Sequence, residues 1–284
     1  MAAEKSLDKL RSEIDRLDDS LHDLLMKRAE VVERIAALKE DGGQVTLRPG
    51  REAEIVRRIV ARHGGRFPKP TLARLWRELI SGMCAIQGQV SMAVYSPERG
   101  AGYLDLARDH YGSSAVMTPW SSPGQVVRAV AEGSANVGIL PMPDRDDGEL
   151  WWTSLMGDSA DMPRIVTRLP FSGAFRSDGL EALVVARQSF DPTGYDRSWL
   201  GVETLPDVSR ARLRAVLGAA GLEPTALAAT HRQSDSWLHL VEISGALAAD
   251  DRRLAKLVER REPVLRCALL GGYPVPLSPE DLAD

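Results

Sequence analysis

Apolar residues recur at intervals of three and four along the first forty positions of the chain. The stripe runs through Leu7, Leu10, Ile14, Leu17, Leu21, Leu24, Val31, Ile35 and Leu38. This spacing predicts one long helix that begins after an N-cap at Ser6 and ends at Gly42 and Gly43. At 1.5 Å per residue the helix would be roughly 50 Å long, which is too long for a small helical unit to cover by itself.

Two shorter helices are predicted after it, from Pro49 to His63 and from Pro70 to Gln87. Two glycines and two prolines separate them and mark a loop. A long helix followed by two shorter ones is typical of half of an intertwined helical dimer. We therefore expect an all-α domain over residues 1–90 that pairs with a second copy of the chain.

After residue 90 the pattern changes to short apolar runs separated by glycine and proline. A strand at 90–95, a loop leading into a helix, and a helix–turn–strand segment at 123–142 indicate an α/β lobe over residues 91–178. Residues 179–284 then predict an α+β domain with a βαββαβ order. Its strands are expected at 182–186, 225–230, 237–244 and 264–270, and its helices at 209–220 and 250–260. The expected fold class is therefore multidomain.

The composition of the 284 residues is that of a globular protein. It is 44% hydrophobic and 27% charged, which excludes collagen, extended disorder and membrane-span compositions. The net charge of −4 argues against nucleic acid as a partner, because phosphate attraction needs a concentrated positive surface. The start of the chain lacks the apolar core of a signal peptide, and no apolar run reaches membrane length. We expect a soluble, cytoplasmic protein with no membrane partner.

The two cysteines, Cys84 and Cys267, lie far apart within apolar runs. This placement predicts reduced, buried thiols, as in a cytoplasmic protein. Neither the cysteines nor the five histidines have the spacing of metal ligands, and the chain has no nucleotide-binding loop. We therefore expect no metal and no cofactor.

One position breaks the apolar stripe of the first helix. Continuing the spacing from Leu24 leads to Arg28. An arginine in an apolar seam is costly unless an anion pairs with it. It could form an internal salt bridge or extend its guanidinium to solvent, or it could form a desolvated site for an anionic ligand. Arg11 and Lys39 flank the same face, where each by itself is typical of a solvated surface charge.

Three segments resemble the all-helical chorismate mutase domain that is found at the N-terminus of bifunctional enzymes of phenylalanine and tyrosine synthesis. They are LRSEIDRLDDSLHDLLMKRAEVVERIAALK, RPGREAEIVRRI and LWRELISGMCAIQ, and the resemblance covers residues 5–88. Several polar positions match in order and spacing in addition to the helix periodicity. The resemblance implies an isomerase that rearranges chorismate, a dicarboxylate, to prephenate in a pocket shared by two subunits.

The resemblance also implies roles for individual residues. Arg28 and Arg51 would hold the substrate within one subunit, and Arg11 would bind a carboxylate from the partner. Lys39 and Gln87 would reach the ether oxygen of the breaking bond, while Glu52 would contact the ring hydroxyl. Taken alone, Glu52 is also typical of an ordinary first-turn acid, and Gln87 of a polar helix end.

These residue types suit an intramolecular rearrangement that needs no nucleophile, redox step or obligatory proton transfer. The enzyme can hold the reactive conformer and place fixed positive charge beside the ether oxygen. Arginine forks match carboxylates bidentately. At two substrate-binding positions the chain departs from the family, because Arg48 stands where Asp is common and Met83 where Ser is common. We expect the site to remain active with an altered affinity.

The α/β lobe is similar to the first lobe of prephenate dehydratases through the segment 133–141, GSANVGILP. That family continues through a second lobe before a catalytic Thr-Arg-Phe motif. Here Thr167-Arg168-Leu169 follows too soon for a second lobe and lacks the Phe, so we expect no dehydratase activity. Thr167 and Arg168 would then be an edge-strand pair without a catalytic role. The pair Trp151-Trp152 could form a binding platform, although such a pair more often covers a core or an interface.

The βαββαβ order resembles an ACT regulatory domain, and the segment 270–274, LGGYP, is like its closing segment in dehydratases, although Gly271-Gly272 could also be a simple turn. Glu203-Thr204-Leu205-Pro206 stands where that family has an effector-contacting Glu-Ser-Arg-Pro. The exchange of its central pair puts phenylalanine binding in doubt, so an aromatic amino-acid effector stays an open expectation. ACT domains pair across subunits, which is a second reason to expect a homodimer.

The leading hypothesis is a cytoplasmic, homodimeric chorismate mutase whose C-terminal half serves regulation or assembly. One alternative is a bifunctional chorismate mutase/prephenate dehydratase. The other is a catalytically inactive amino-acid sensor or partner-binding protein, in which the helical unit is only a dimerisation arm.

Overall fold

A computed structural model describes residues 2–38, 47–97, 102–143, 149–157, 159, 161–173, 179–259 and 262–283. The chain divides into two compact units. The first comprises Met1–Thr46 with Gly82–Gln89, and the second comprises Leu47–Ser81 with Val90–Asp284. None of the helices in the described ranges combines the length and hydropathy needed to cross a lipid bilayer.

The long predicted helix is present as α1, Ala2–Leu38. It begins before Ser6, so the expected N-cap is wrong and Ser6 lies inside the helix. The glycines expected to end it, 42 and 43, lie outside the described residues. The predicted apolar stripe is exposed along its length, from 49% at Leu7 to 61% at Leu24 and 44% at Ile35. A single chain therefore leaves the hydrophobic side of α1 largely uncovered.

The two shorter helices are confirmed as α2, Pro49–Arg62, and α3, Lys69–Gln87. Pro49 occupies the first turn of α2, where a missing backbone N–H leaves no hydrogen bond unmade. The helix ends at Arg62 with His63 as its C-cap, ahead of Gly65 with its φ of +99°.

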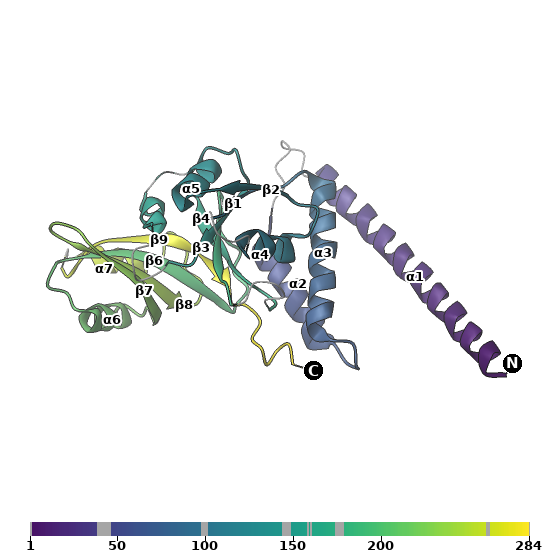
Figure 1. The fold of residues 1–284 in the computed structure, drawn as a ribbon. Coiled ribbons are helices and arrows are strands. Elements are labelled where there is room, and N and C mark those ends of the chain that lie inside the picture. The colour runs from purple at the N-terminus through teal and green to yellow at the C-terminus, as the bar shows by residue number, and fades with distance from the viewer. Residues whose placement is uncertain are drawn as a thin grey trace. The chain divides into compact units, whose positions relative to one another are not determined.

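Nine strands form one sheet in the described part of the chain, in the order β2-β1-β3-β5-β4-β9-β6-β8-β7 (Figure 1). The strands of the α/β part are β1 Ser91–Tyr95, β2 Val116–Trp120, β3 Val137–Pro141, β4 Arg164–Leu169 and β5 Ala182–Ala186. Its helices are α4 Gly102–Tyr111 and α5 Pro123–Ala131, followed by the short 3-10 helix η1 Trp151–Met156. Apolar residues of α4 and α5 belong to different core clusters, so the two helices cover opposite faces of this part of the sheet.

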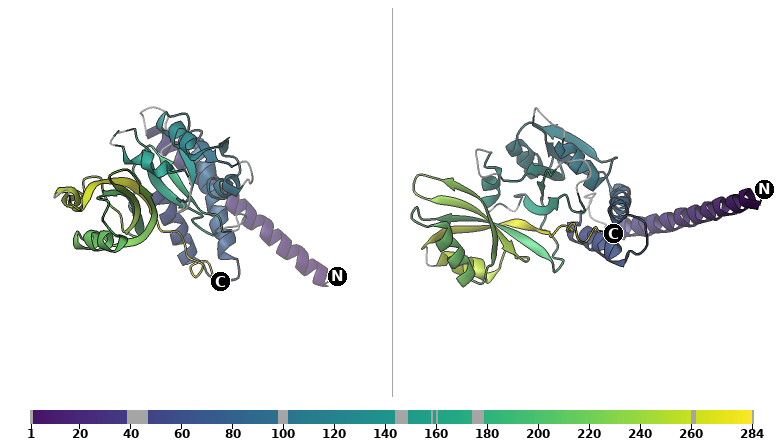
Figure 2. Two further views of the ribbon diagram at one scale, coloured as in Figure 1. Left: turned by 60° about the vertical axis from the view of Figure 1, so that its left-hand side comes forward. Right: turned by 60° about the horizontal axis from the view of Figure 1, so that its bottom comes forward.

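The predicted βαββαβ order is present, but it starts at a different strand. It is formed by β6 Asp196–Thr204, α6 Arg210–Ala219, β7 Pro224–Arg232, β8 Trp237–Ser244, α7 Arg252–Glu259 and β9 Val264–Pro274 (Figure 2). The expected first strand, 182–186, exists as β5 but pairs antiparallel with β3 and β4. The assignment of this strand to the βαββαβ part is therefore wrong, because its partners lie in the α/β part.

The two faces of the βαββαβ part pack against different neighbours. Leu213 and Leu217 of α6 and Leu254 and Leu257 of α7 share one core cluster with alternate residues of the strands. The other face carries Trp199, which packs in the same cluster as η1. Trp151 and Trp152 of η1 are 2% and 1% exposed, so this pair covers a core and offers no binding platform.

The α/β part and the βαββαβ part meet where β4 runs parallel to β9 at Ile165 and Gly271. A Cβ at Gly271 would lie 2.2 Å from the Ile165 carbonyl oxygen, and its φ is +124°. Only glycine fits so close an approach in this backbone region. Gly271 and Gly272 lie inside β9, so the alternative interpretation of a simple turn is wrong.

Candidate active site

The long helix α1 carries two of the predicted site residues in different settings. Arg11 is exposed and forms an ion pair with Asp8 over 3.2 Å. Arg28 is half-buried, and its Nη1 is buried without a hydrogen-bond partner among the described residues. A buried guanidinium nitrogen normally has an acceptor, so this atom is suited to a ligand oxygen. Lys39 lies outside the described residues.

The first turn of α2 brings together three site residues, each with a different partner. Arg48, which precedes the helix, forms an ion pair with Asp191 at 2.9 Å. Arg51 pairs with Glu54 one turn later, at 3.1 Å. All four side chains are about half exposed, and pairs of this kind contribute little stability. Both arginines are therefore held only weakly by their carboxylate partners.

Glu52 differs from its neighbours because it is buried. Its Oε2 accepts a hydrogen bond of 3.2 Å from Nη1 of Arg77 on α3. Burial raises the pKa of Glu52, while the Arg77 charge and a backbone hydrogen bond at Arg48 oppose that rise. Burial likewise lowers the pKa of Arg77, against the opposing charge of Glu52. Desolvation thus acts against both charges of this pair.

Arg77 was not among the residues singled out from the sequence. It is 2% exposed, and its guanidinium carbon lies 4.8 Å from the centre of the Phe171 ring. The signal was available, because Arg77 stands in the buried stripe of α3 between Ala73 and Ile80. The argument that identified Arg28 in an apolar seam applies equally to this position.

The end of α3 carries the last two predicted site residues, Met83 and Gln87. They lie one turn apart on α3, and both are half-buried. The predicted site is divided between the two compact units. Arg11, Arg28, Met83 and Gln87 belong to the first unit, and Arg48, Arg51 and Glu52 to the second.

The residues of the Thr-Arg-Leu segment lie in the interior of the sheet. β4 pairs with both β5 and β9, so the expectation of an edge strand is wrong. Thr167 is 2% exposed, and its Oγ1 has no hydrogen-bond partner in the described part of the chain. Arg168 donates to Glu181 at 2.8 Å and to the Tyr273 hydroxyl at 3.2 Å. Tyr273 in turn donates to Glu242.

This network connects β4, β8 and β9 through charge-assisted hydrogen bonds. Burial alone would lower the pKa of Arg168, but Tyr273 and Glu181 outweigh burial and raise it. Burial and the Glu242 charge raise the pKa of Tyr273. Arg168 therefore remains a cation and keeps its hydrogen bonds to Glu181 and Tyr273. This arrangement is typical of a structural arginine that links neighbouring strands.

The segment 203–206 adjoins a cavity of about 360 Å³ at the start of α6. Arg210, Thr230, Trp237 and His239 are among the residues that line it. His239 is 2% exposed, and its Nε2 lies 3.1 Å from Thr204 Oγ1. Its Nδ1 meets no partner among the described residues. Burial and the nearby Arg210 lower the pKa of His239 to about 4, so the ring is neutral at pH 7.

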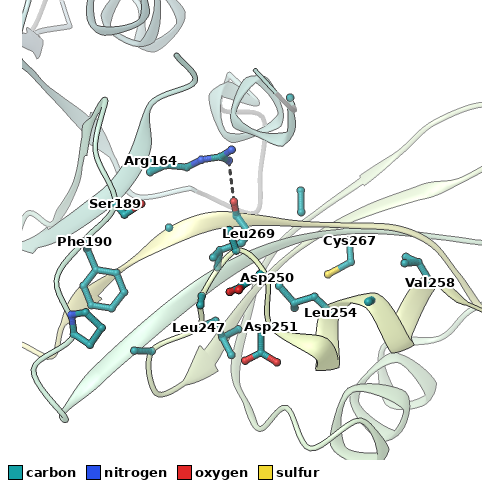
Figure 3. Close-up of a pocket in the computed structure, with 18 residues that line it drawn as sticks. Arg164, Ser189, Phe190, Leu247, Asp250, Asp251, Leu254, Val258, Cys267 and Leu269 are labelled. Atoms are coloured by element: carbon teal, nitrogen blue, oxygen red, sulfur yellow. Dashed lines mark hydrogen bonds between the residues drawn. The ribbon is translucent and has the colours of Figure 1, made fainter. Parts of the chain in front are cut away.

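A larger cavity of about 920 Å³ lies between α7, β9 and the loop after β5 (Figure 3). Its walls are mainly apolar, with Phe190, Leu247 and Leu254 among them, and Arg164 donates to the Leu269 carbonyl oxygen at 2.8 Å. Burial raises the pKa of Cys267 in its wall to about 12, so the thiol stays protonated and is a poor nucleophile. Cys84 and Cys267 form no disulfide and are half-buried, less enclosed than expected.

Comparison with known proteins identifies the helical segment. The family model for chorismate mutase type II matches residues 10–88. The 4-amino-4-deoxychorismate mutase of Streptomyces venezuelae is 31% identical over 93 residues, which cover 32% of this chain and 88% of that protein.

Similarity also extends along the rest of the chain. The bifunctional chorismate mutase/prephenate dehydratase of Pseudomonas aeruginosa is 28% identical over 297 residues, covering 99% of this chain and 77% of that protein. The solved prephenate dehydratase of Arthrobacter aurescens, a complex with L-Phe, is 12% identical with a TM-score of 0.48, over 68% of this chain and 94% of that one. Through residues 10–88, the chain belongs to the chorismate mutase type II family.

Proposed function

We propose that the protein is a homodimeric, cytoplasmic chorismate mutase that rearranges chorismate to prephenate. The observation that carries this proposal is Arg28, whose buried Nη1 lacks a partner among the described residues and lies within the segment matched by the family. A dimerisation arm has no reason to keep a buried cation in its seam, whereas a site for a dicarboxylate requires one.

Each proposed role follows from the charges on the substrate and on its transition state. Arg28 and Arg51 hold the substrate within one subunit, and Arg11 of the partner subunit binds a substrate carboxylate. Lys39 and Gln87 place hydrogen-bond donors at the ether oxygen, which becomes more negative in the transition state. Glu52 accepts a hydrogen bond from the ring hydroxyl, and positions 48 and 83 line the substrate site. The chain achieves the rearrangement by holding one reactive conformer.

The test is the loss of chorismate absorbance on addition of the purified protein, with prephenate quantified after acid conversion. Turnover that saturates with chorismate is the expected result. No turnover by a protein shown to be folded and dimeric would contradict the proposal and favour a ligand sensor.

The uncovered stripe of α1 supports the proposed dimer, since large apolar strips on soluble proteins mark association surfaces. The Leu21→Glu substitution is expected to weaken the dimer by about 100-fold or more, because pairing would bury an unpaired carboxylate at a cost of ~3 kcal/mol. Sedimentation equilibrium measures this change. Asp19→Lys is the matched control, because it alters a charge on the opposite side of α1. A wild-type chain that stays monomeric, or a Leu21→Glu variant that dimerises normally, would refute the prediction.

A dehydratase activity in the same chain is the second candidate, and the similarity to bifunctional relatives favours testing it. The arrangement of the Thr-Arg-Leu segment argues against dehydratase activity, because Arg168 already donates hydrogen bonds to Glu181 and Tyr273. We expect no phenylpyruvate when prephenate is supplied. Formation of phenylpyruvate that is lost with Thr167→Val would establish the bifunctional alternative.

The βαββαβ part is proposed to act as an ACT-like regulatory domain. Supporting this, the cavity beside residues 203–206 combines an aromatic wall at Trp237 with a cation at Arg210. Such a lining suits an aromatic amino acid. Calorimetric titration with phenylalanine and with tyrosine tests the proposal, and loss of binding in Trp237→Ala would assign it to this cavity.

A further inference from the structure

Within the second compact unit, α2 and the part of α3 up to Ser81 are fastened to the C-terminal half of the chain at several points. Arg57 on α2 donates to Thr193 Oγ1 at 2.8 Å and to the carbonyl oxygens of Tyr195 and Val275 at 2.9 and 2.6 Å. On α3, the Ser81 hydroxyl donates to the carbonyl oxygen of Tyr111 at the end of α4. The helix α2, which carries Arg51 and Glu52, is therefore packed as part of the second compact unit.

Among the described residues, Arg77 is the cation that contacts both Glu52 and a residue of the C-terminal half. Its Nη1 donates to Glu52 Oε2, and its guanidinium carbon lies over the ring of Phe171, which follows β4. The aromatic face attracts the cation most strongly where water is excluded, as it is here. The side chain of Arg77 is 2% exposed, while that of Glu52 is 12% exposed. The Glu52 side chain is thus held by Arg77 and retains a small accessible surface.

We propose that Arg77 is a positioning residue of the mutase site, which fixes the Glu52 carboxyl group and ties it through Phe171 to the C-terminal half. The inference rests on the proposed function, because Glu52 is a site residue only in a mutase. Arg77 touches no substrate and acts through Glu52. The C-terminal half thereby contributes to catalysis without a reaction of its own.

The charged groups around Glu52 determine how its titration responds. Arg77 faces it from α3, and His110 and Tyr111 approach Arg77 from α4. Burial and Arg77 lower the pKa of His110 well below its usual range, so His110 is neutral and cannot replace the cation. Burial raises the pKa of Glu52 and Arg77 restrains that rise, so removing Arg77 raises it further. The carboxylate would then become protonated at a higher pH.

The experiment compares the pH dependence of kcat/KM for chorismate in the wild type, Arg77→Met and Arg77→Lys. In Arg77→Met the acid limb is expected to move to higher pH by about one unit or more, because a nearby opposite charge is lost. Arg77→Lys keeps the charge and should return the limb toward that of the wild type. Arg58→Met, on the exposed side of α2, is the matched control and should leave the profile unchanged.

If Arg77 had a purely structural role, its replacement would lower the amount of folded enzyme but leave the acid limb of the kcat/KM profile at the same pH. An acid limb that does not move in Arg77→Met therefore overturns the proposal. If Arg77→Met fails to fold, Arg77→Gln provides the neutral variant and is judged in the same way. Absence of turnover in the wild type would refute the proposed function instead. In that case the pKa of Glu52 can be measured directly, from the NMR chemical shift of its carboxyl carbon as a function of pH in the same variants. A higher pKa in Arg77→Met than in the wild type would show that Arg77 keeps the carboxylate ionised.

Discussion

Replacing Arg28 with leucine is expected to reduce chorismate turnover by about 100-fold or more, because the substrate carboxylate loses a contact that holds the reactive conformer. The reason is that the buried Nη1 of Arg28 has no protein acceptor in the described part of the chain. It is therefore available for a substrate oxygen. Leucine restores the apolar spacing of α1, so the dimer should persist and the free energy of unfolding should not fall.

The measurement pairs steady-state kinetics with sedimentation and urea unfolding on the same samples. Arg34→Leu is the control, because Arg34 lies on α1 with an exposed side chain. Turnover within about threefold of the wild type in Arg28→Leu would remove this residue from the site. A gain in stability together with an inactive wild type would identify α1 as a dimerisation arm alone.

Gly271→Ala is expected to destabilise the fold by about 3 kcal/mol or more. A Cβ at this position would lie 2.2 and 2.5 Å from the carbonyl oxygen and amide nitrogen of Ile165, which are backbone atoms with little room to move. Left-handed backbone costs a residue with a side chain about 1–2 kcal/mol, and overpacking adds about 1–3 kcal/mol. The substitution should separate β4 from β9 at the point where the α/β part meets the βαββαβ part.

Urea unfolding of Gly271→Ala and Gly194→Ala separates these two contributions. Gly194 has a φ of +84° but nothing within 4 Å of its would-be Cβ, so its substitution carries the backbone cost alone. We expect a loss of about 1 kcal/mol for Gly194→Ala. Equal losses in the two variants would show that the β4–β9 approach is looser than the structure indicates.

The elements that the sequence predicted best are those with a long or uninterrupted pattern. The spacing of the apolar stripe predicted α1, and proline and glycine at their ends defined α2 and α3. The strand β6 was missed, since its apolar and polar residues do not alternate clearly across Asp196–Thr204. Because the pattern does not predict β6, it places β5 first in the βαββαβ order.

The residues of the proposed site likewise divide into those that the sequence predicted and those that only the structure revealed. Residue type and spacing identified Arg28 and the Arg51–Glu52 pair, because a charge in a seam and a family motif are visible along the chain. The partner of Glu52 was not found, since Arg77 lies on another helix. The network of Arg168, Glu181 and Tyr273 was missed for the same reason, because its members are far apart in the sequence.

The sequence by itself determined the helical N-terminal segment, its exposed apolar stripe and the cationic residues suited to a dicarboxylate. These properties depend on the period of a helix and the charge of a side chain, which are local. Only the tertiary structure decided which strands share a sheet, that Glu52 is buried against Arg77, and that Gly271 is needed inside a strand. Those features arise when distant segments approach one another and exclude water, so the energies involved depend on neighbours that the linear order does not specify.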